Sequence, residues 1–339
     1  MTSRERVRAI IEHRPADQVG VNFNPPHASD FGHIGVRLVK PAGIPDAYFE
    51  WGTYPELMNQ LDHFNGEVHY DYFGNIIGRL NGITKGECVK GALTDWEDLE
   101  TYELPQIDTA AFTAEAAEKN KTSDRYIVAG SPFSVFSILR DARLMTNALM
   151  DTVLEPENVE AFLQKILDRN LELIEYLKDF GADALMFWDD WGTQDRTFIS
   201  PNTFRELFKP IYKQIADRLH RYKMHLIVHS CGYNYAFMED FIDAGIDVLQ
   251  FDQLGAYGYE KMADEFAGRV TFWSPLDIQK TLPTGDRALI ESEALRMISA
   301  FKGKGSLLLN DYASYADIGV KEEWATWARD VFMAHLADK

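Results

Sequence analysis

The sequence contains very few cysteines and no long apolar run. Its 339 residues include two cysteines, Cys88 and Cys231, which could form at most one disulfide. A disulfide-stabilised scaffold is therefore excluded, and a reducing compartment is indicated. No stretch of about 18 consecutive apolar residues occurs, so we expect no transmembrane helix. The opening M-T-S-R-E begins a charged amphipathic helix rather than a signal peptide. Together these features predict a cytoplasmic protein.

Basic residues are also scarce. The chain has 34 Lys and Arg against 53 Asp and Glu, which gives a formal net charge of -19. Such a charge repels nucleic acid phosphates and anionic membrane surfaces. We therefore expect a protein that binds neither nucleic acid nor membranes.

Several motifs of common enzyme classes are missing. No G-x-G-x-x-G follows a predicted strand, and no G-x-x-x-x-G-K-[ST] occurs, which removes the main support for nucleotide-binding folds. The absence of G-x-S-x-G argues against a serine hydrolase of the α/β type. Internal repeats and low-complexity tracts are absent as well.

Strands and helices alternate over most of the chain. Apolar runs of strand length are predicted at residues 19–23, 126–129, 184–188, 226–229, 248–251, 270–273 and 307–309. Helical periodicity is predicted at residues 135–150, 157–180, 201–222, 235–244, 259–266, 286–301 and 321–337. This alternation predicts parallel pairing with right-handed crossovers. We therefore expect an α/β protein with a TIM-type (β/α)8 barrel.

The N-terminal part departs from this regular pattern. Residues 30–91 are rich in glycine and aromatic side chains, and residues 67–73 and 76–80 flank Gly74 and Asn75 as in a hairpin. We interpret the stretch 30–91 as a lid or hairpin elaboration of one barrel domain that covers residues 1–339.

Polar side chains follow the predicted strands, where barrel enzymes carry their active sites. They are Ser131, Asp189, Asp190, Gln194, His229, Cys231, Asp252, Gln253, Ser274, Asp277, Asn310, Asp311 and Tyr312. Paired carboxylates such as Asp189 and Asp190 can share a proton, hold a cation or accept hydrogen bonds. Capping of the following turn by one of the two aspartates is the alternative.

His229 and Cys231 form a His-x-Cys strand ending. Residues i and i+2 of a strand point to the same side, so the imidazole and the thiolate could bind one metal ion. A core histidine beside a buried, inert thiol explains the pair as well. A zinc site needs further ligands, and Asp190, Asp252 and Asp311 are all candidates by position. A cysteine nucleophile with His229 as its base is disfavoured, because partners at i and i+2 rarely aim at each other.

Aromatic residues gather near the strand ends. We expect Phe187, Trp188, Phe251, Phe272 and Trp273 to be mostly core. Trp191 and the aromatic residues of the elaboration (Tyr70, Tyr72 and Phe73) lie beyond the strands and are better candidates for pocket walls. Such walls suit a flat or methoxylated substrate.

Several stretches of the chain resemble the uroporphyrinogen decarboxylase superfamily. They are residues 4–17, 187–194 (F-W-D-D-W-G-T-Q), 199–204 with 208–212, 229–232 (H-S-C-G), 242–253 and 272–277. The resemblance implies a TIM-type barrel with one of two activities. One branch decarboxylates a tetrapyrrole without metal or cofactor, and the other transfers methyl groups in partnership with corrinoid proteins.

The methyltransferase-like branch is the closer match. Residues 70–74 (Y-D-Y-F-G) are similar to its aspartate-containing loop, and His229 and Cys231 match its zinc-binding His-x-Cys. The later cysteine of that branch is missing, since residues 309–315 are L-N-D-Y-A-S-Y. The resemblance therefore implies a zinc site of His229 and Cys231 that is completed by Asp311 or by another oxygen ligand, and the alternative is that no zinc is bound. A site with only one thiolate favours an oxygen-bonded methyl donor over a thiol acceptor.

The decarboxylase branch fits less well. Residues 21–29 (V-N-F-N-P-P-H-A-S) lack the arginine pair that holds its carboxylate-rich substrate, and the net charge opposes a polyanion. We therefore predict a demethylase component that passes a methyl group from a small methoxylated or methylated compound to a corrinoid protein carrying the cobalamin. Asp190 and Asp71 are its predicted catalytic residues, and Trp191, Gln194, Asp189, Tyr72 and Tyr312 its predicted substrate-binding residues. A cofactor-free decarboxylase and a non-catalytic protein that binds tetrapyrrole or corrinoid are the alternatives.

Overall fold

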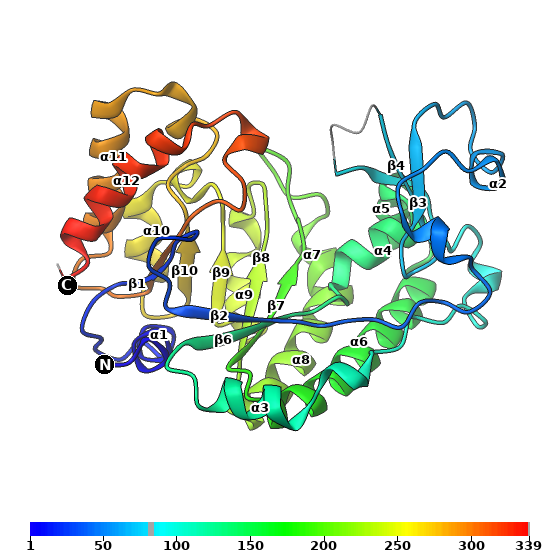
Figure 1. The fold of residues 1–339 in the computed structure, drawn as a ribbon, viewed down its shortest axis with the longest axis horizontal. Helices are drawn as coiled ribbons and strands as arrows, with labels where there is room; N and C mark the ends of the chain where they lie inside the picture. Colours follow the sequence, from blue (N-terminus) through cyan, green and yellow to red (C-terminus); the bar gives the residue numbers. More distant parts are fainter. Residues whose placement is uncertain (81–84, 338–339) are drawn as a thin grey trace.

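A computed structural model describes residues 1–80 and 85–337 of the chain. Eight parallel strands form a nearly closed barrel, and helices pack around its outside (Figure 1). The strand order is β1-β11-β10-β9-β8-β7-β6-β2, so the predicted TIM-type barrel is confirmed. The barrel strands are β1 (Gly20–Asn22), β2 (Phe31–Gly35), β6 (Tyr126–Gly130), β7 (Ala184–Trp188), β8 (His225–His229), β9 (Val248–Gln250), β10 (Thr271–Ser274) and β11 (Leu307–Asn310).

Most of the helices pack around the outside of the barrel, whereas α1 lies at one end of it and α2 packs against the small sheet of the elaboration. They are α1 (Ser3–Ile11), α2 (Pro55–Met58), α3 (Ala114–Lys121), α4 (Val135–Arg143), α5 (Met145–Leu154), α6 (Pro156–Phe180), α7 (Pro201–Thr203), α8 (Lys209–Arg221), α9 (Met238–Asp243), α10 (Tyr259–Phe266), α11 (Arg287–Ala300) and α12 (Glu322–His335). Short 3₁₀ turns occur at Asp46–Phe49, Trp96–Asp98, Thr109–Ala111, Tyr235–Phe237, Leu254–Ala256, Leu282–Thr284 and Ala316–Ile318, and a π turn at Phe204–Phe208. Within the described ranges, we find no helix with the length and apolarity to span a membrane.

Helix α1 closes the N-terminal end of the barrel. Thr2 and Glu5 form the capping box that starts it, and Val7, Ile10 and Ile11 are buried. These side chains pack against the inward-facing residues of the strands, including Phe31 and Trp273, whose rings stack at 4.6 Å. The opposite, C-terminal end of the strands is therefore the end that is left for a site.

The barrel has a seam between β1 and β2. In the part of the chain that the structure describes, β1 pairs with β11 and β2 with β6, but β1 and β2 share no ladder. Asp30 holds the two edges together instead, because its carboxylate accepts hydrogen bonds from Val21 N at 2.9 Å and from Arg6 Nη1 at 2.7 Å. A side-chain carboxylate thus replaces part of a backbone ladder.

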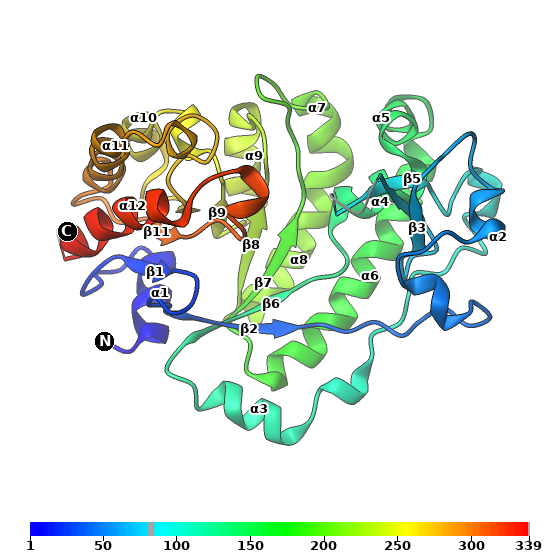
Figure 2. The same ribbon diagram turned by 45° about the horizontal axis from the view of Figure 1, so that its top comes forward.

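Strand β2 lies within the stretch that we predicted to be an elaboration. Residues 31–35 (F-G-H-I-G) belong to the barrel, where Phe31 is opposite Tyr126 of β6. The predicted hairpin is present, but it is part of a three-stranded antiparallel sheet of β3 (Glu67–Tyr70), β4 (Ile76–Arg79) and β5 (Glu87–Lys90). This small sheet lies beside α4 and α5 in both ribbon views (Figures 1 and 2). The first residues of the predicted elaboration are therefore part of the barrel.

The helix predicted at residues 135–150 is two helices. Leu144 has φ +64° and separates α4 from α5. A positive φ in leucine costs free energy and needs support from the surrounding structure.

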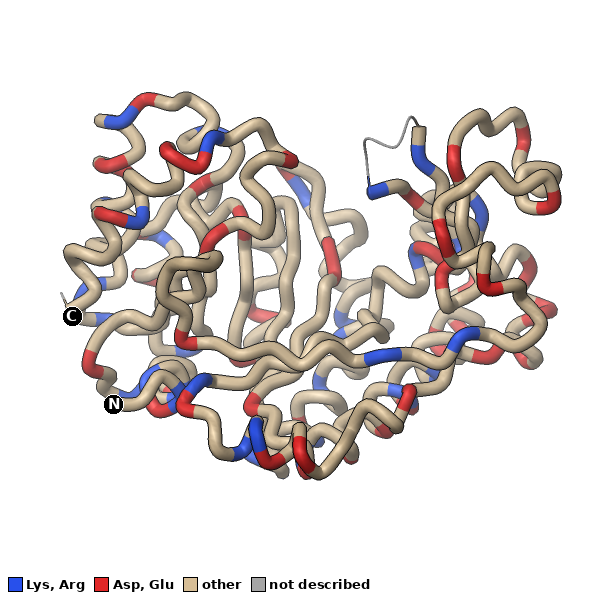
Figure 3. Tube along the Cα trace, in the orientation of Figure 1, with Lys and Arg blue, Asp and Glu red and all other residues tan. Residues whose placement is uncertain are grey.

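Charged positions of both signs alternate over the outer helices (Figure 3). Acidic and basic positions are thus interspersed along the helices.

Candidate active site

Three candidate ligands meet at the C-terminal ends of β7 and β8. His229 is the last residue of β8, Cys231 follows two residues later, and Asp190 follows β7. Nε2 of His229 lies 3.4 Å from Cys231 Sγ and 3.5 Å from Asp190 Oδ1. One ligand atom from each residue can be chosen so that all lie within 4.8 Å of one another. The same-side prediction for His229 and Cys231 is therefore matched by the geometry, and Asp190 joins them.

The loops that carry these residues are in direct backbone contact. Gly232 has φ +85°, and a Cβ added to it would lie 2.1 Å from Gly192 O. Only glycine fits this position, because a side chain would push the two loops apart. Cys231 N donates a hydrogen bond of 2.7 Å to Asp190 Oδ1. The position of Asp190 is thus set by the loop that carries the cysteine.

Gln250 of β9 orients the imidazole of His229. Its Nε2 donates to Asp252 Oδ1 at 2.8 Å, which leaves Oε1 to accept from His229 Nδ1. Because Nδ1 is the donor in this bond, Nε2 is the ring atom that faces Cys231 and Asp190. Metal-binding histidines commonly use their second nitrogen in this way. Sequence reasoning missed Gln250, since it lies inside a predicted strand and gave no signal of its own.

The histidine and the aspartate shift each other's pKa. Burial alone lowers the pKa of His229, but hydrogen bonds to Asp190 and Cys231 outweigh it and hold the pKa well above its usual value. Burial raises the pKa of Asp190, but the hydrogen bond and the charge of His229 outweigh it and lower the pKa. Asp190 is therefore an ionised acceptor beside a positively charged imidazole when no metal is bound.

A cavity of ≈ 660 Å³ opens beside Cys231 at the strand ends. Its lining includes Gln194, Asp252, Gln253 and Tyr312, and Lys280 is the one cationic residue that the described part of the chain contributes to it. Two of the predicted substrate-binding residues, Gln194 and Tyr312, thus share a cavity with the cysteine.

The two tryptophans near β7 exchange the roles that we predicted. Trp188 lies on the same face of β7 as the inward-facing Ala184 and Met186, and 46% of its surface is exposed. It is opposite His229 in the strand register. Trp191 is fully buried, and its ring stacks on Phe136 at 4.5 Å. Trp188 is therefore the exposed tryptophan of the two and lies next to His229, and Trp191 is core.

Asp189 and Asp311 have structural partners. The buried carboxylate of Asp189 accepts backbone hydrogen bonds from the start of α4 (residues 135–137) and one from Tyr212 Oη at 2.7 Å. Asp311 forms a buried ion pair with Arg329 at 2.9 Å and also accepts from Tyr315 Oη. Asp190, and not Asp311, accompanies His229 and Cys231. Sequence position alone could not separate the two, because both follow a strand.

Asp71 lies at the turn between β3 and β4. It accepts hydrogen bonds from Phe73 N, Asn75 N and Asn75 Nδ2, each at 2.8 Å. Burial raises its pKa to about 6 despite these bonds. Asp71 and Tyr72 line a second cavity of ≈ 450 Å³. Neither residue is among the lining residues of the cavity at Cys231.

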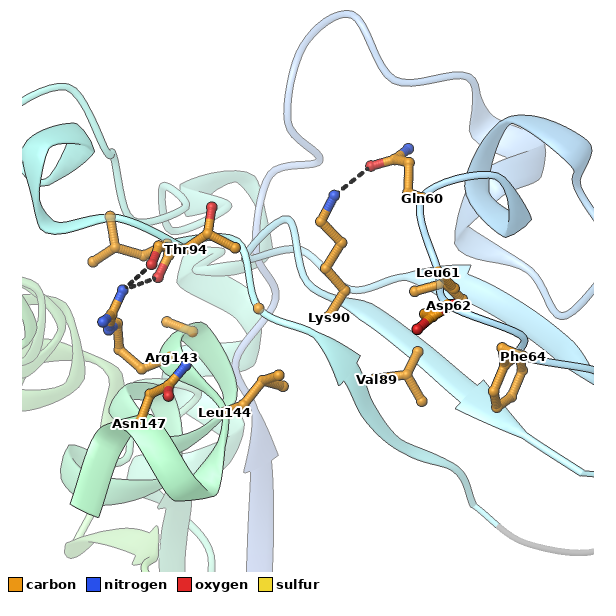
Figure 4. A pocket seen from close by; sticks show the side chains of 13 residues that line it. Gln60, Leu61, Asp62, Phe64, Val89, Lys90, Thr94, Arg143, Leu144 and Asn147 are labelled. Atoms are coloured by element: carbon orange, nitrogen blue, oxygen red, sulfur yellow. Dashed lines mark hydrogen bonds between the residues drawn. The ribbon is translucent and has the colours of Figure 1, made fainter. Parts of the chain in front are cut away.

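A third cavity separates the small sheet from the α4–α5 junction (Figure 4). Lys90 bonds to Gln60 on one wall, and Arg143 donates to the backbone of Thr94 on the other. None of its lining residues is among the predicted site residues. It marks the contact between elaboration and barrel.

The donor set at the strand ends fits zinc. Imidazole nitrogen, thiolate sulfur and carboxylate oxygen are all zinc ligands, and sites with three protein ligands keep a position open for a substrate. The hydrogen bond from Nδ1 of His229 to Gln250 supplies the orientation that such a ligand needs. We therefore take His229, Cys231 and Asp190 as the residues that would hold the ion.

The barrel with a polar cluster at its strand ends defines the class, and comparison with known proteins defines the family. Residues 85–310 match the family model of uroporphyrinogen decarboxylase (URO-D). This match covers more than half of the chain, so the chain belongs to the uroporphyrinogen decarboxylase family.

Known relatives are distant. The chloroplastic uroporphyrinogen decarboxylase of Nicotiana tabacum is 30% identical over 128 residues, which is 36% of this chain and 32% of that protein. The uroporphyrinogen decarboxylase of Oceanobacillus iheyensis is 27% identical over 127 residues, 38% of this chain and 33% of that protein. The matched part spans about a third of these curated relatives. A solved methyltransferase from Methanosarcina mazei matches with a TM-score of 0.64 and 17% identity, over 98% of this chain and 99% of that one. This likeness shows a common fold.

Proposed function

We propose that the protein is a methyltransferase that takes a methyl group from a small methoxylated or N-methylated compound and passes it to a corrinoid protein. The cluster of His229, Cys231 and Asp190 beside the strand-end cavity is the observation that carries this proposal. The nearly full-length fold likeness to the Methanosarcina mazei methyltransferase supports it.

Each residue of the cluster has a separate task in this proposal. Bound zinc would supply Lewis acidity toward the leaving oxygen or nitrogen of the methyl donor. Gln250 holds the ring of His229 so that Nε2 faces the donor set, and Cys231 N holds the carboxylate of Asp190. Trp188 would form the wall against which a flat substrate packs.

The corrinoid belongs to a partner in this reaction. The cobalt(I) of this corrinoid would supply the electron pair of the new cobalt–carbon bond, while the leaving oxygen or nitrogen would keep the electron pair of the broken methyl bond and take up a proton from solvent. The partner must reach the C-terminal ends of the strands, since α1 closes the other end. The cavity at Cys231 is at that accessible end.

A cofactor-free decarboxylase is the second candidate, and Asp71 favours it. Its raised pKa, about 6, is suitable for a group that holds a proton near neutral pH. A carboxylate-rich substrate requires several cationic clamps, which argues against this candidate, because among the described residues Arg37 is the cationic residue in the lining of the cavity at Asp71 and Lys280 the one at the strand-end cavity.

The test combines metal analysis with two activity assays. We expect about one zinc per chain in the purified protein and its loss in Cys231→Ser and Asp190→Ala, while Asp195→Asn, at an exposed position on the loop after β7, serves as the acidic control. With cob(I)alamin and 2-methoxyphenol we expect methylcobalamin and catechol, followed by absorbance and chromatography. Methyl transfer by a metal-free parent protein would contradict the proposed zinc site.

The alternatives give different results in the same assays. Carbon dioxide release from uroporphyrinogen without methyl transfer to cobalamin would replace the proposal with the decarboxylase. Tight retention of cobalamin or a tetrapyrrole with neither reaction would identify a binding protein.

A further inference from the structure

A cavity of ≈ 340 Å³ lies at the N-terminal end of the barrel, away from the site described above. It is enclosed by the segment after α1 (residues 13–19) and by the loop between α11 and β11. The lining includes none of the candidate catalytic or metal-binding residues. Any ligand of this cavity is therefore distinct from the substrate of the proposed reaction.

The floor of this cavity is apolar. Ile10, Phe301 and Leu307 line it and are 6%, 4% and 2% exposed, and Val19 and Ile298 complete it. Cavities with an apolar floor and a few polar groups at the rim are typical of small-molecule sites. An apolar portion of a ligand would remove this surface from water.

The rim of the cavity is cationic in a protein with net charge -19. Arg14, Lys302 and Lys304 all line it. Arg14 pairs with Glu12 and Lys304 with Asp264, whereas Lys302 has no ion pair with any residue that the structure describes. Lys302 is therefore the rim cation whose charge is not neutralised by an acidic side chain of the described residues.

The loop of residues 302–306 (K-G-K-G-S) also presents backbone donors. Gly303 and Gly305 have φ of +76° and +66°, and a Cβ at either would meet no atom within 4 Å. Their N–H groups have no acceptor in the described part of the chain. Backbone N–H groups in such turns commonly bind anions. Two free donors thus lie next to the unpaired lysine.

Hydrogen bonds of Ser306 connect the walls of the cavity. Ser306 Oγ lies 3.0 Å from His13 Nδ1 and accepts a hydrogen bond from Gly268 N at 2.8 Å. The contact between Ser306 and His13 joins the loop before β11 to the segment after α1. The cavity is therefore preformed, and ligand binding needs little rearrangement.

We propose that this cavity binds a small amphiphilic anion, a carboxylate or phosphate monoester that carries a short apolar chain or ring. The anionic group contacts Lys302 and the N–H groups of Gly303 and Gly305, and the apolar body covers Phe301 and Leu307. We propose a free molecule rather than a bilayer, because the net charge of -19 opposes approach to an anionic membrane surface.

Titration calorimetry of the full chain tests this proposal with octanoate and octyl phosphate as anionic probes and octyltrimethylammonium as the cationic counterpart. We expect the two anions to bind with one site per chain and the cation not to bind. The double variant Lys302→Glu/Lys304→Glu should weaken octanoate binding at least tenfold. Lys213→Glu on α8 is the control, since it changes charge at an exposed position far along the chain, and it should bind octanoate as the parent does.

Three results would overturn the proposal. They are equal octanoate affinity in the double variant and the parent, equal binding of the anionic and the cationic probes, and no binding of either anion. Flotation with phosphatidylglycerol vesicles separates a free ligand from a lipid surface, and lysine-dependent flotation would assign the cavity to a membrane contact instead. Both lysines are exposed, so we expect thermal unfolding of the double variant to match the parent and to exclude a folding defect.

Discussion

The side-chain oxygen of Gln250 faces Nδ1 of His229, because the side-chain nitrogen of Gln250 donates a hydrogen bond to Asp252. The orientation of the candidate metal ligand therefore depends on a residue from the neighbouring strand. Replacing Gln250 with leucine removes the acceptor but leaves all three donor atoms.

We expect Gln250→Leu to weaken zinc binding about 10- to 100-fold, as is usual when the hydrogen-bond partner of a metal-binding histidine is lost. Competition with a chromogenic chelator measures this affinity. The double variant Gln250→Glu/Asp252→Asn keeps an oxygen acceptor for Nδ1 and a donor–acceptor pair between positions 250 and 252, so it should restore most of this affinity. Equal affinity in the parent and in Gln250→Leu would show that Gln250 does not orient the ligand.

For Asp311 we expect a loss of stability without a loss of zinc. Its carboxylate is paired with the buried Arg329, and removing one member of a buried pair typically costs about 3–5 kcal/mol. We expect Asp311→Ala to lower the free energy of unfolding by this amount while zinc per folded chain is unchanged. Denaturant unfolding and elemental analysis of the same preparation check both parts. Loss of zinc from a stably folded variant would return Asp311 to the ligand set.

The two tryptophans should respond differently to substitution. Trp191→Ala empties a fully buried site and should destabilise the fold by about 3–5 kcal/mol. Trp188→Ala changes an exposed side chain and should leave stability nearly unchanged.

Acrylamide quenching provides a second readout for this pair. Trp188 is the only tryptophan in the described residues that is exposed rather than buried or half-buried. The quenchable fraction of tryptophan fluorescence should therefore fall in Trp188→Ala and not in Trp191→Ala. An unchanged quenchable fraction in Trp188→Ala would show that another indole is the accessible one.

Asp71 predicts a pH dependence of stability. Its pKa is about 6 in the folded state against 3.8 as the ordinary value, so the folded state binds more protons between these pH values. The stability of the parent relative to Asp71→Asn should therefore fall as the pH rises from 4 to 6, by up to about 3 kcal/mol, and stay level above. Urea unfolding of both proteins across this range measures the difference. A difference that rises with pH would show that the carboxylate is stabilised in its ionised form.

The barrel could be predicted from sequence because its strands are apolar runs at regular intervals. Strands β6 to β11 are all found close to their predicted places. Strand β2 could not be found this way, since F-G-H-I-G has two glycines and a histidine, and it becomes a strand through its pairing with β6. The break at Leu144 is equally hidden, because leucine gives no signal of a positive φ.

The candidate site was predictable only in part. The i, i+2 relation places His229 and Cys231 on one side of a strand, and this follows from local geometry alone. The choice of Asp190 over Asp311 depends on contacts with residues far along the chain, such as Cys231 N for one and Arg329 for the other. The faces of Trp188 and Trp191 depend on where β7 ends, and a strand boundary is harder to locate than the strand itself.

The seam between β1 and β2 implies a gradient of amide hydrogen exchange around the barrel. The amides of β7 and β8 lie in a ladder that continues on both sides, so their exchange requires opening of the barrel as a whole. The amides at the edges of β1 and β2 depend on Asp30 and its contact with Arg6. Exchange is therefore expected to begin at the seam, and the strands that carry His229 and Asp190 should be among the last to lose protection.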